Sequence, residues 1–197
     1  MSTPQFELNM DQGAHFSATI NWYGGGTFRA PIEEIDPGYP TRVRVTAHGL
    51  PTSSPTPIII SGVQGANILN SRNTAIDLCD TVDDDYFTVP VSTVSCNWLT
   101  GTGEITYSQP TDMTDCTARC QLRSKWNAGE FIHEFTTENS GIILDSNDGS
   151  IQLDAPSADT TSMNFVKAYG DIEVITSGGV VTRVARLVIT FSREMTK

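Results

Sequence analysis

The sequence has no long hydrophobic run and few basic residues. Its 197 residues include 12 lysines and arginines against 23 aspartates and glutamates, for a formal net charge of −11. A membrane-spanning helix needs ~20 consecutive apolar residues, and the chain contains no such run. A surplus of acid repels both phosphate backbones and anionic lipid. We therefore expect a soluble protein that binds neither nucleic acid nor membrane.

The first residues also lack the basic start and the apolar segment of a secretory signal peptide. This predicts synthesis and folding in a cytoplasm, where cysteines are kept reduced. The chain has four cysteines, Cys79, Cys96, Cys116 and Cys120. We expect them to be free thiols that pack as small hydrophobic side chains.

Common catalytic motifs are missing as well. The sequence has no GxSxG, no HExxH, no P-loop and no GxGxxG before a helix. No Cys-x-x-Cys pair exists, and Cys116 and Cys120, four residues apart on a predicted strand, would lie about 13 Å apart, too far to share one zinc ion. The sequence therefore predicts no enzyme, no metal site and no cofactor.

Alternation of apolar and polar residues is the main signal that is present. In residues 15–22, Phe16, Ala18, Ile20 and Trp22 share one face, which is the period of a half-buried strand. Residues 41–47 and 116–123 alternate in the same way. Further strands are expected at 57–60, 75–79, 86–91, 103–107, 130–136, 142–145, 150–153, 171–176 and 180–191, with a glycine turn at 177–179 and a helical turn at 157–164. Many short strands with almost no helix predict an all-β fold.

The order of these signals predicts two domains. Residues 31–110 are denser in proline and serine and carry a full set of strand and turn signals. The flanking segments, 1–30 and 111–197, look incomplete alone, so the first strand needs partners from the carboxyl-terminal half. Surface loops tolerate such insertions. We predict a discontinuous domain, 1–30 with 111–197, and an inserted domain, 31–110.

The flanking segments contain residues that match a known family. The start Asp11-Gln12-Gly13-Ala14-His15-Phe16 and the segment Met113–Arg123 are two of these matches. They resemble the immunoglobulin-like domain of phage tail and baseplate proteins, in which a Gln-Gly-aromatic strand ends in Trp. Residues 141–144, 149–153, 169–174 and 179–183 extend the similarity. Cys116 and Cys120 depart from the pattern, because the family usually has larger core residues there.

The insert is similar to a second module. Its matching segments are 43–50, 60–63, 69–70 and 85–89. They resemble a small β-barrel found in phage structural proteins and related to the first-catalytic-cysteine half-domain of ubiquitin-activating enzymes. That module carries no catalytic cysteine, and the resemblance implies a passive structural or spacer unit.

Together the resemblances imply an immunoglobulin-like β-sandwich with a small β-barrel inserted in a loop. They imply a structural protein of the virion, in the tail, baseplate, collar or fibre attachment. It would contact other copies of itself and other tail, neck or baseplate proteins. Two alternatives are a receptor- or carbohydrate-binding module that contacts a host surface glycan, and a capsid decoration protein. Whether Cys79 and Cys96 are bonded stays open, since a virion outside its host can be oxidised.

Few residues are candidates for a site. Trp98 and Trp126 are the tryptophans expected to be exposed, as interface or ligand contacts, whereas Trp22 is expected in the core. The acidic run 80–85 could be a calcium loop or a solvated turn, but it lacks the spacing of an EF-hand. The pairs Glu33–Glu34 and Glu130–Glu134 would serve glycoside hydrolysis only if a cleft held their carboxylates about 5–10 Å apart.

Overall fold

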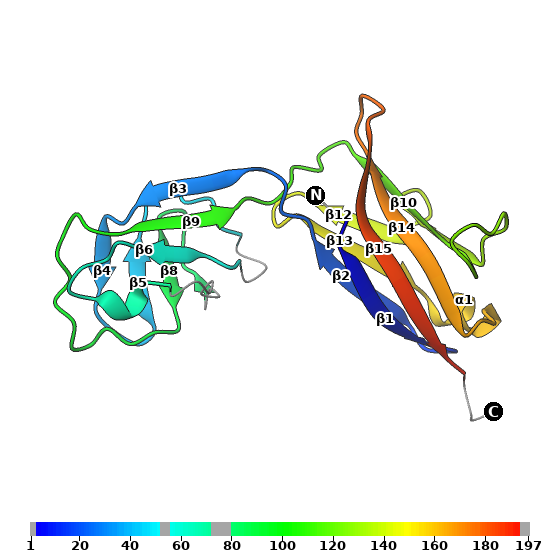
Figure 1. The fold of residues 1–197 in the computed structure, drawn as a ribbon, viewed down its shortest axis with the longest axis horizontal. Helices are drawn as coiled ribbons and strands as arrows, with labels where there is room; N and C mark the ends of the chain where they lie inside the picture. The colour runs from blue at the N-terminus through cyan, green and yellow to red at the C-terminus, as the bar shows by residue number, and fades with distance from the viewer. Residues whose placement is uncertain (1–2, 52–55, 72–79, 194–197) are drawn as a thin grey trace. The chain divides into compact units, whose positions relative to one another are not determined.

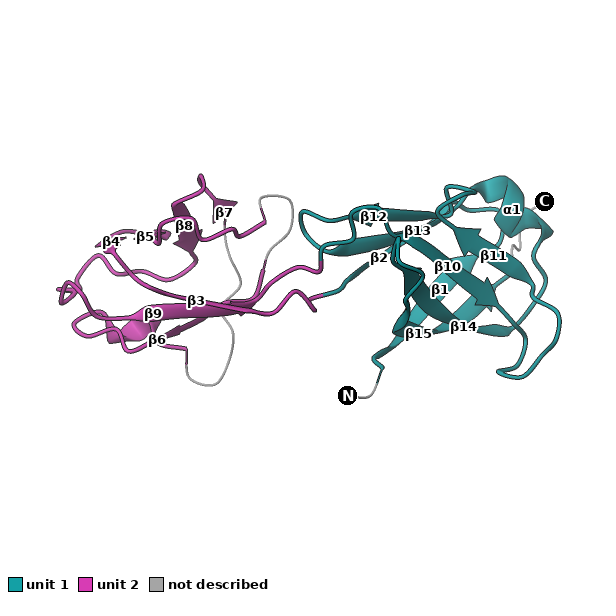
Figure 2. Cartoon of the chain, turned by 90° about the horizontal axis from the view of Figure 1, so that it is seen from above, with its two compact units in different colours: residues 1–22, 112–197 teal, residues 23–111 magenta. Residues whose placement is uncertain are grey.

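The computed structural model of the chain describes residues 3–51, 56–71 and 80–193. Nearly all its regular elements are β-strands, which confirms the all-β prediction. The chain forms two compact units (Figure 2): unit 1 is Met1–Trp22 with Asp112–Lys197, and unit 2 is Tyr23–Thr111. Unit 2 is thus an uninterrupted segment between two pieces of unit 1. Its first boundary precedes the expected one at residue 31, because strand β3 (Thr27–Pro31) pairs with β9 inside unit 2.

Unit 1 contains a five-stranded sheet. In spatial order its strands are β1 (Gln5–Asp11), β15 (Val181–Ser192), β14 (Lys167–Ile175), β10 (Thr117–Leu122) and β11 (His133–Thr136) (Figure 1; β11 is labelled in Figure 2). β1 runs parallel to β15, and the other neighbours are antiparallel. β1 was not among the expected strands, although Phe6, Leu8 and Met10 alternate with polar residues along it.

A three-stranded sheet completes unit 1. Its order is β12 (Ile142–Asp145), β13 (Ser150–Ala155) and β2 (Phe16–Asn21). The inward side chains of both sheets form one core, which makes unit 1 a β-sandwich. Trp22 packs against this core as expected, and so does the half-buried Cys116, while Cys120 is fully buried. Both cysteines are free thiols.

The hairpin of β14 and β15 forms as the sequence predicts. The carbonyl of Thr176 accepts a hydrogen bond from the Gly179 amide at 2.8 Å. Of the two glycines in the turn only Gly179 has a positive φ, of 79°, a conformation that glycine adopts without steric cost. The register shifts between Ile172 and Glu173, and this bulge lets Val184 and Ala185, neighbours in sequence, both face the core.

Unit 2 contains two smaller sheets. One has the order β3, β9 (Glu104–Ser108) and β6 (Ile59–Ser61). The other has the order β4 (Glu34–Asp36), β5 (Thr41–Arg44), β8 (Tyr86–Val89) and β7 (Asp80–Thr81). Their buried residues form a separate core. In the described part of unit 2 no hydrogen-bonded ladder joins the two sheets, whereas the resemblance of the insert implies a small barrel.

Helical structure is minor. A 3-10 turn, η1 (Asn67–Leu69), lies in unit 2, and the only α-helix of the described residues is α1 (Ser157–Ser162), at the predicted position with Asp159 in its first turn. Across the ranges 3–51, 56–71 and 80–193, no helix is long and apolar enough to span a membrane. The strand expected at 75–79 lies outside the described residues.

Candidate functional site

The outer face of β10 and β14 carries two rows of polar side chains. Successive side chains of a strand point to opposite faces. Ala118 and Cys120 of β10 therefore lie in the core, while Arg119 and Gln121 face outward. On β14 the outward positions are Tyr169, Asp171 and Glu173. The same alternation that builds the core thus aligns two rows of polar side chains on the opposite face.

Cross-strand pairs order this surface. Arg119 and Glu173 are direct partners in the β10–β14 register, and both Nε and Nη2 of Arg119 donate to Glu173 Oε2, at 2.9 and 2.8 Å. Gln121 and Glu134 are partners in the β10–β11 register, and Gln121 Nε2 donates to Glu134 Oε1 at 2.6 Å. Direct partners of opposite charge stabilise a sheet, and here they also fix the side-chain positions.

Arg123 fastens the β10–β11 loop to the sheet. Its backbone forms an isolated bridge with Tyr169, with both amide-to-carbonyl distances at 2.8 Å. Its Nη1 donates to the carbonyls of Ala128 and Gly129, at 2.6 and 2.7 Å, and its Nη2 donates to Gln121 Oε1. One guanidinium therefore joins the end of the loop to the sheet surface.

This arrangement places Trp126 over Tyr169. The two ring centroids are 5.0 Å apart at an interplanar angle of 42°. Arg186 of β15 lies with its Cζ 5.5 Å from the Trp126 ring, within the range of a cation–π contact. Asp171 holds the Arg186 and Arg183 side chains through ion pairs of 3.5 and 3.1 Å. Trp126 remains 46% exposed despite these contacts.

A depression of about 290 Å³ lies between Trp126 and the Arg119–Glu173 pair. Gly170, Gln121 and Tyr169 contribute to its lining. Its charged lining residues are two arginines and two acids: Arg119, Arg123, Asp171 and Glu173. The depression therefore combines an aromatic wall with hydrogen-bond donors and acceptors, and the residues that line it carry no net formal charge.

A second depression lies in unit 2 along β3 and β9. Arg29 and Glu104 line it, and Arg29 Nη2 donates to Glu104 Oε1 at 2.6 Å. Its remaining lining residues are Ala30, Pro31, Ser61, Gly62 and Gly103. It has no aromatic side chain and no further charged group, so it offers less to a ligand than the depression beside Trp126.

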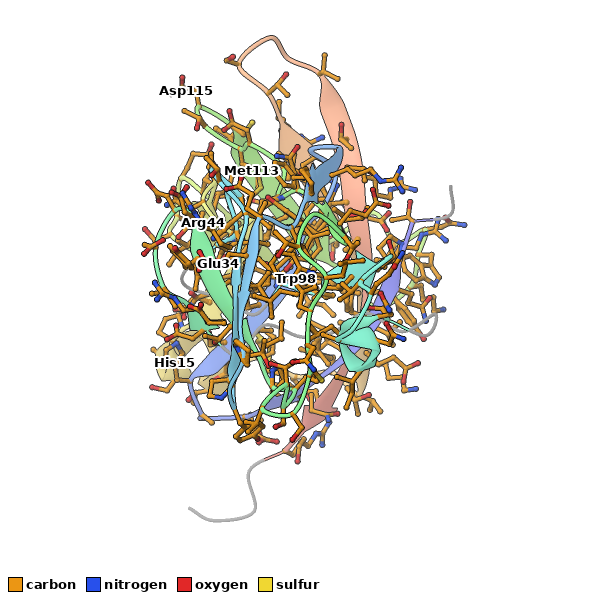
Figure 3. The ribbon with its side chains drawn as sticks, turned by 90° about the vertical axis from the view of Figure 1, so that its left-hand side faces the viewer. His15, Glu34, Arg44, Trp98, Met113 and Asp115 are labelled. Carbon is orange, nitrogen blue, oxygen red and sulfur yellow. The ribbon has the colours of Figure 1, made fainter. Side chains whose placement is uncertain are left out.

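The two candidate tryptophans differ in their surroundings. Trp98, labelled in Figure 3, is half-buried against the core of unit 2, and its Nε1 donates to the Thr102 carbonyl at 3.0 Å. It lines neither depression. Trp126 is the more exposed of the two, and it lies in a depression beside a second aromatic ring.

The acidic run 80–85 is organised as a turn. Asp83 Oδ1 accepts hydrogen bonds from the amides of Asp85 and Tyr86, both at 2.9 Å, and Asp85 Oδ1 accepts one from the Ala47 amide at 2.8 Å. Among the described residues no cluster of three or more histidine, cysteine, aspartate or glutamate side chains is placed to hold a metal ion. Cys79 lies outside the described residues. Whether it is bonded to Cys96 therefore stays an open prediction.

Three of the four glutamates in the candidate carboxylate pairs are hydrogen-bonded to other groups. Glu33 accepts hydrogen bonds from the Thr46 amide and hydroxyl, at 3.1 and 3.0 Å. Glu34, labelled in Figure 3, accepts one from the Tyr86 hydroxyl at 3.4 Å. Glu134 is bonded to Gln121, and Glu130 is exposed. None of these glutamates lines the two depressions.

Most residues of the Trp126 depression were not predicted as a site. The outward row Arg119, Gln121 and Arg123 is visible in the alternation of residues 116–123. Its partners Asp171 and Glu173 lie on β14, about 50 residues later in the chain. Residues so far apart in sequence meet only when folding closes a long loop. Comparison with protein-family models and with curated proteins finds no match for this chain.

Proposed function

We propose that this chain is a structural protein of a tailed-bacteriophage virion, in the tail, baseplate, collar or fibre attachment. It acts through contacts with other copies of itself and with neighbouring virion proteins, and it catalyses no reaction. One observation carries the proposal: the residues behind the two family resemblances separate cleanly into the two units. Those similar to the phage immunoglobulin-like domain lie in unit 1, and those similar to the phage barrel module lie in unit 2.

The placement of these residues within the units gives further support. Residues 113–123, 149–153 and 169–174 contribute to β10, β13 and β14 of the unit 1 sandwich. Residues 43–50 and 85–89 contribute to β5 and β8, which pair within unit 2. Each set of matching residues thus falls on strands of a single unit.

The presence of two separate hydrophobic cores supports the proposed structural role. Each unit buries its own set of apolar side chains, so we expect each to be able to fold without the other. The carboxylates nearest to the main depression are bound to arginines: Glu173 to Arg119, and Asp171 to Arg183 and Arg186. Ion pairs of this kind position side chains, and they favour a binding surface over general acid–base chemistry.

The test is the presence of the protein in particles. Phage particles from a culture that carries the gene would be purified on a density gradient and analysed by mass spectrometry. Immunogold labelling with an antibody against the purified protein would then locate it by electron microscopy. We expect the protein in intact particles, with label at the tail or neck. Label over the head would favour the decoration alternative, and absence from purified particles would overturn the proposal.

A second candidate function is a receptor- or carbohydrate-binding module of the virion. The observation that favours it is Trp126, which is 46% exposed in a depression without net formal charge. Exposed aromatic rings beside polar groups bind sugars by stacking.

A further inference from the structure

We infer that the depression beside Trp126 binds an uncharged carbohydrate, with the indole ring as the stacking surface and the outward side chains of β10 and β14 as hydrogen-bonding partners. This inference rests on the second candidate function and is independent of the place of the protein in a virion.

The balance of charge identifies the ligand class. The charged residues that line the depression are two arginines, Arg119 and Arg123, and two acids, Asp171 and Glu173. Arg183 and Arg186 do not line it, and both are paired with Asp171. A phosphate or sulfate would meet two carboxylates, and a cation would meet two guanidinium groups. Like charges at close range disfavour either ion. An uncharged ligand with many hydroxyls meets no such repulsion and can use both the donors and the acceptors.

The aromatic wall favours a sugar among uncharged ligands. A pyranose ring has an apolar face of C–H groups and a rim of hydroxyls. Trp126 offers the exposed aromatic surface for that face, and Tyr169 supports the indole from a centroid distance of 5.0 Å. Arg119 and Glu173 stand at the far side of the depression, where donors and acceptors are needed for the hydroxyl rim.

The site is fixed before any ligand arrives. Arg123 holds the loop of Trp126 through the carbonyls of Ala128 and Gly129. Glu173 holds Arg119 through two donors of one guanidinium. Because these side chains are already ordered, binding costs little conformational entropy. A volume of about 290 Å³ is near the small end of ligand sites, which suits one sugar unit of a longer glycan.

Protein NMR on the full chain tests this site. The three tryptophans, Trp22, Trp98 and Trp126, each give one indole N–H signal. The probes are the methyl glycosides of glucose, galactose, mannose and N-acetylglucosamine, with methyl glucuronide and inorganic phosphate as charged comparisons. We expect at least one neutral glycoside to shift the Trp126 signal, with a Kd on the order of 1–10 mM, and to leave the Trp22 and Trp98 signals in place.

Variants separate the roles of the side chains. Trp126→Ala is expected to weaken binding of that glycoside roughly tenfold or more, as truncation of a central aromatic contact does. Trp98→Phe, a change at a tryptophan of unit 2 that does not line the depression, is the matched control and is expected to retain binding. Glu173→Gln leaves the depression with one excess positive charge, so it should raise the affinity for methyl glucuronide relative to methyl glucoside several-fold.

Three outcomes would overturn the inference. The first is that none of the four neutral glycosides shifts the Trp126 signal. The second is that the charged probes bind better than the neutral ones in the unmodified protein. The third is that Trp126→Ala instead weakens self-association in sedimentation, with no glycoside bound, since the surface would then be a protein contact. Detection of the chain in virions is a separate measurement, so either proposal can fail alone.

Discussion

Gly170 of β14 packs directly against Cys120 of β10. A Cβ atom on Gly170 would stand 3.0 Å from the Cys120 Sγ and 3.1 Å from the Leu122 Cδ2. Real Cβ atoms are rarely found so close to a neighbour, and interiors packed at this density resist an added methyl group. Gly170 also lines the Trp126 depression, so this contact joins the packing of the core to the floor of the candidate site.

Gly170→Ala is expected to lower the free energy of unfolding of unit 1 by about 1–3 kcal/mol, because the added methyl group must displace side chains of β10. Urea denaturation followed by circular dichroism measures the change. Gly129→Ala is the control, since a Cβ at Gly129 meets nothing within 4 Å, and it should stay within about 0.5 kcal/mol of the parent. Equal losses in both variants would show that the contact with Cys120 does not set the cost.

Cys120 should be chemically inert in the folded protein. It is fully buried, and burial raises the pKa of its thiol to about 12, with Asp171 and Glu173 adding in the same direction. Only the thiolate reacts with alkylating agents, so iodoacetamide near pH 8 should leave Cys120 unmodified. Cys116, which is half-buried, should react faster, and urea should make the two alike. Peptide mass spectrometry reads the sites, and equal native rates would contradict the packing around Cys120.

The fold was predictable where the sequence signal is local. Phe16 and Ile20 face the core because alternation on one strand determines the buried face. The β14–β15 hairpin follows from its glycine turn in the same way. Short strands carry weaker signals: β4 has three residues and β7 has two. Each pairs with the next strand along the chain, β4 with β5 and β7 with β8, but a strand of two or three residues is too short to show an alternation of apolar and polar residues.

The candidate site was predictable only in part. Trp126 could be predicted as an exposed tryptophan because it precedes a turn and the residues around it do not alternate between apolar and polar. Its environment depends on Arg123, which reaches both the loop carbonyls and Gln121, and on Tyr169, which is brought alongside by the β10–β14 pairing. Trp98 has similar local sequence features, but the Thr102 carbonyl and the core of unit 2 hold it. Tertiary contacts, and not composition, separate the two residues.

The two cores should respond separately to mutation. Leu153 is fully buried in the core of unit 1, and Ile60 is fully buried in the core of unit 2. Each change to alanine should cost its own unit about 2–5 kcal/mol, because it removes apolar contacts and leaves a cavity. Hydrogen exchange resolved by peptide would show Leu153→Ala lowering protection only in unit 1 and Ile60→Ala only in unit 2. Loss of protection across both units in either variant would mean that they unfold as one.

The stability of unit 2 should fall on mild acidification. His48 is buried, and burial lowers its pKa below the ordinary 6.5, although the backbone of Tyr86 and Asp83 and the carboxylates of Asp83 and Asp85 oppose the shift. The unfolded chain therefore takes up this proton at a higher pH than the folded chain does. Stability from the neutral imidazole is full above pH 6.5 and declines as the pH falls below it.

His48→Gln should flatten this part of the pH dependence, since glutamine does not titrate. The amide oxygen can still accept the Leu50 amide hydrogen that His48 Nδ1 accepts at 3.0 Å. Hydrogen exchange of unit 2 amides at pH 7 and about 5.5, corrected for intrinsic rates, gives the two free energies of opening. If the parent and His48→Gln lose the same amount of protection between these pH values, His48 is not the titrating group.

Asp83 should matter for stability, and calcium should not. Its Oδ1 accepts the amide hydrogens of Asp85 and Tyr86, so Asp83→Ala leaves two donors without that partner and should cost about 1 kcal/mol. Asp84→Ala is the matched control, because the Asp84 carboxylate makes no hydrogen bond within the described residues, and it should change stability by about 0.5 kcal/mol or less.

Excess calcium would raise Tm by mass action if the run 80–85 bound it. The turn already occupies the Oδ1 atoms of Asp83 and Asp85 with backbone amides, so we expect no rise in a thermal melt. A calcium-dependent rise that Asp83→Ala abolishes and Asp84→Ala keeps would establish the metal loop instead.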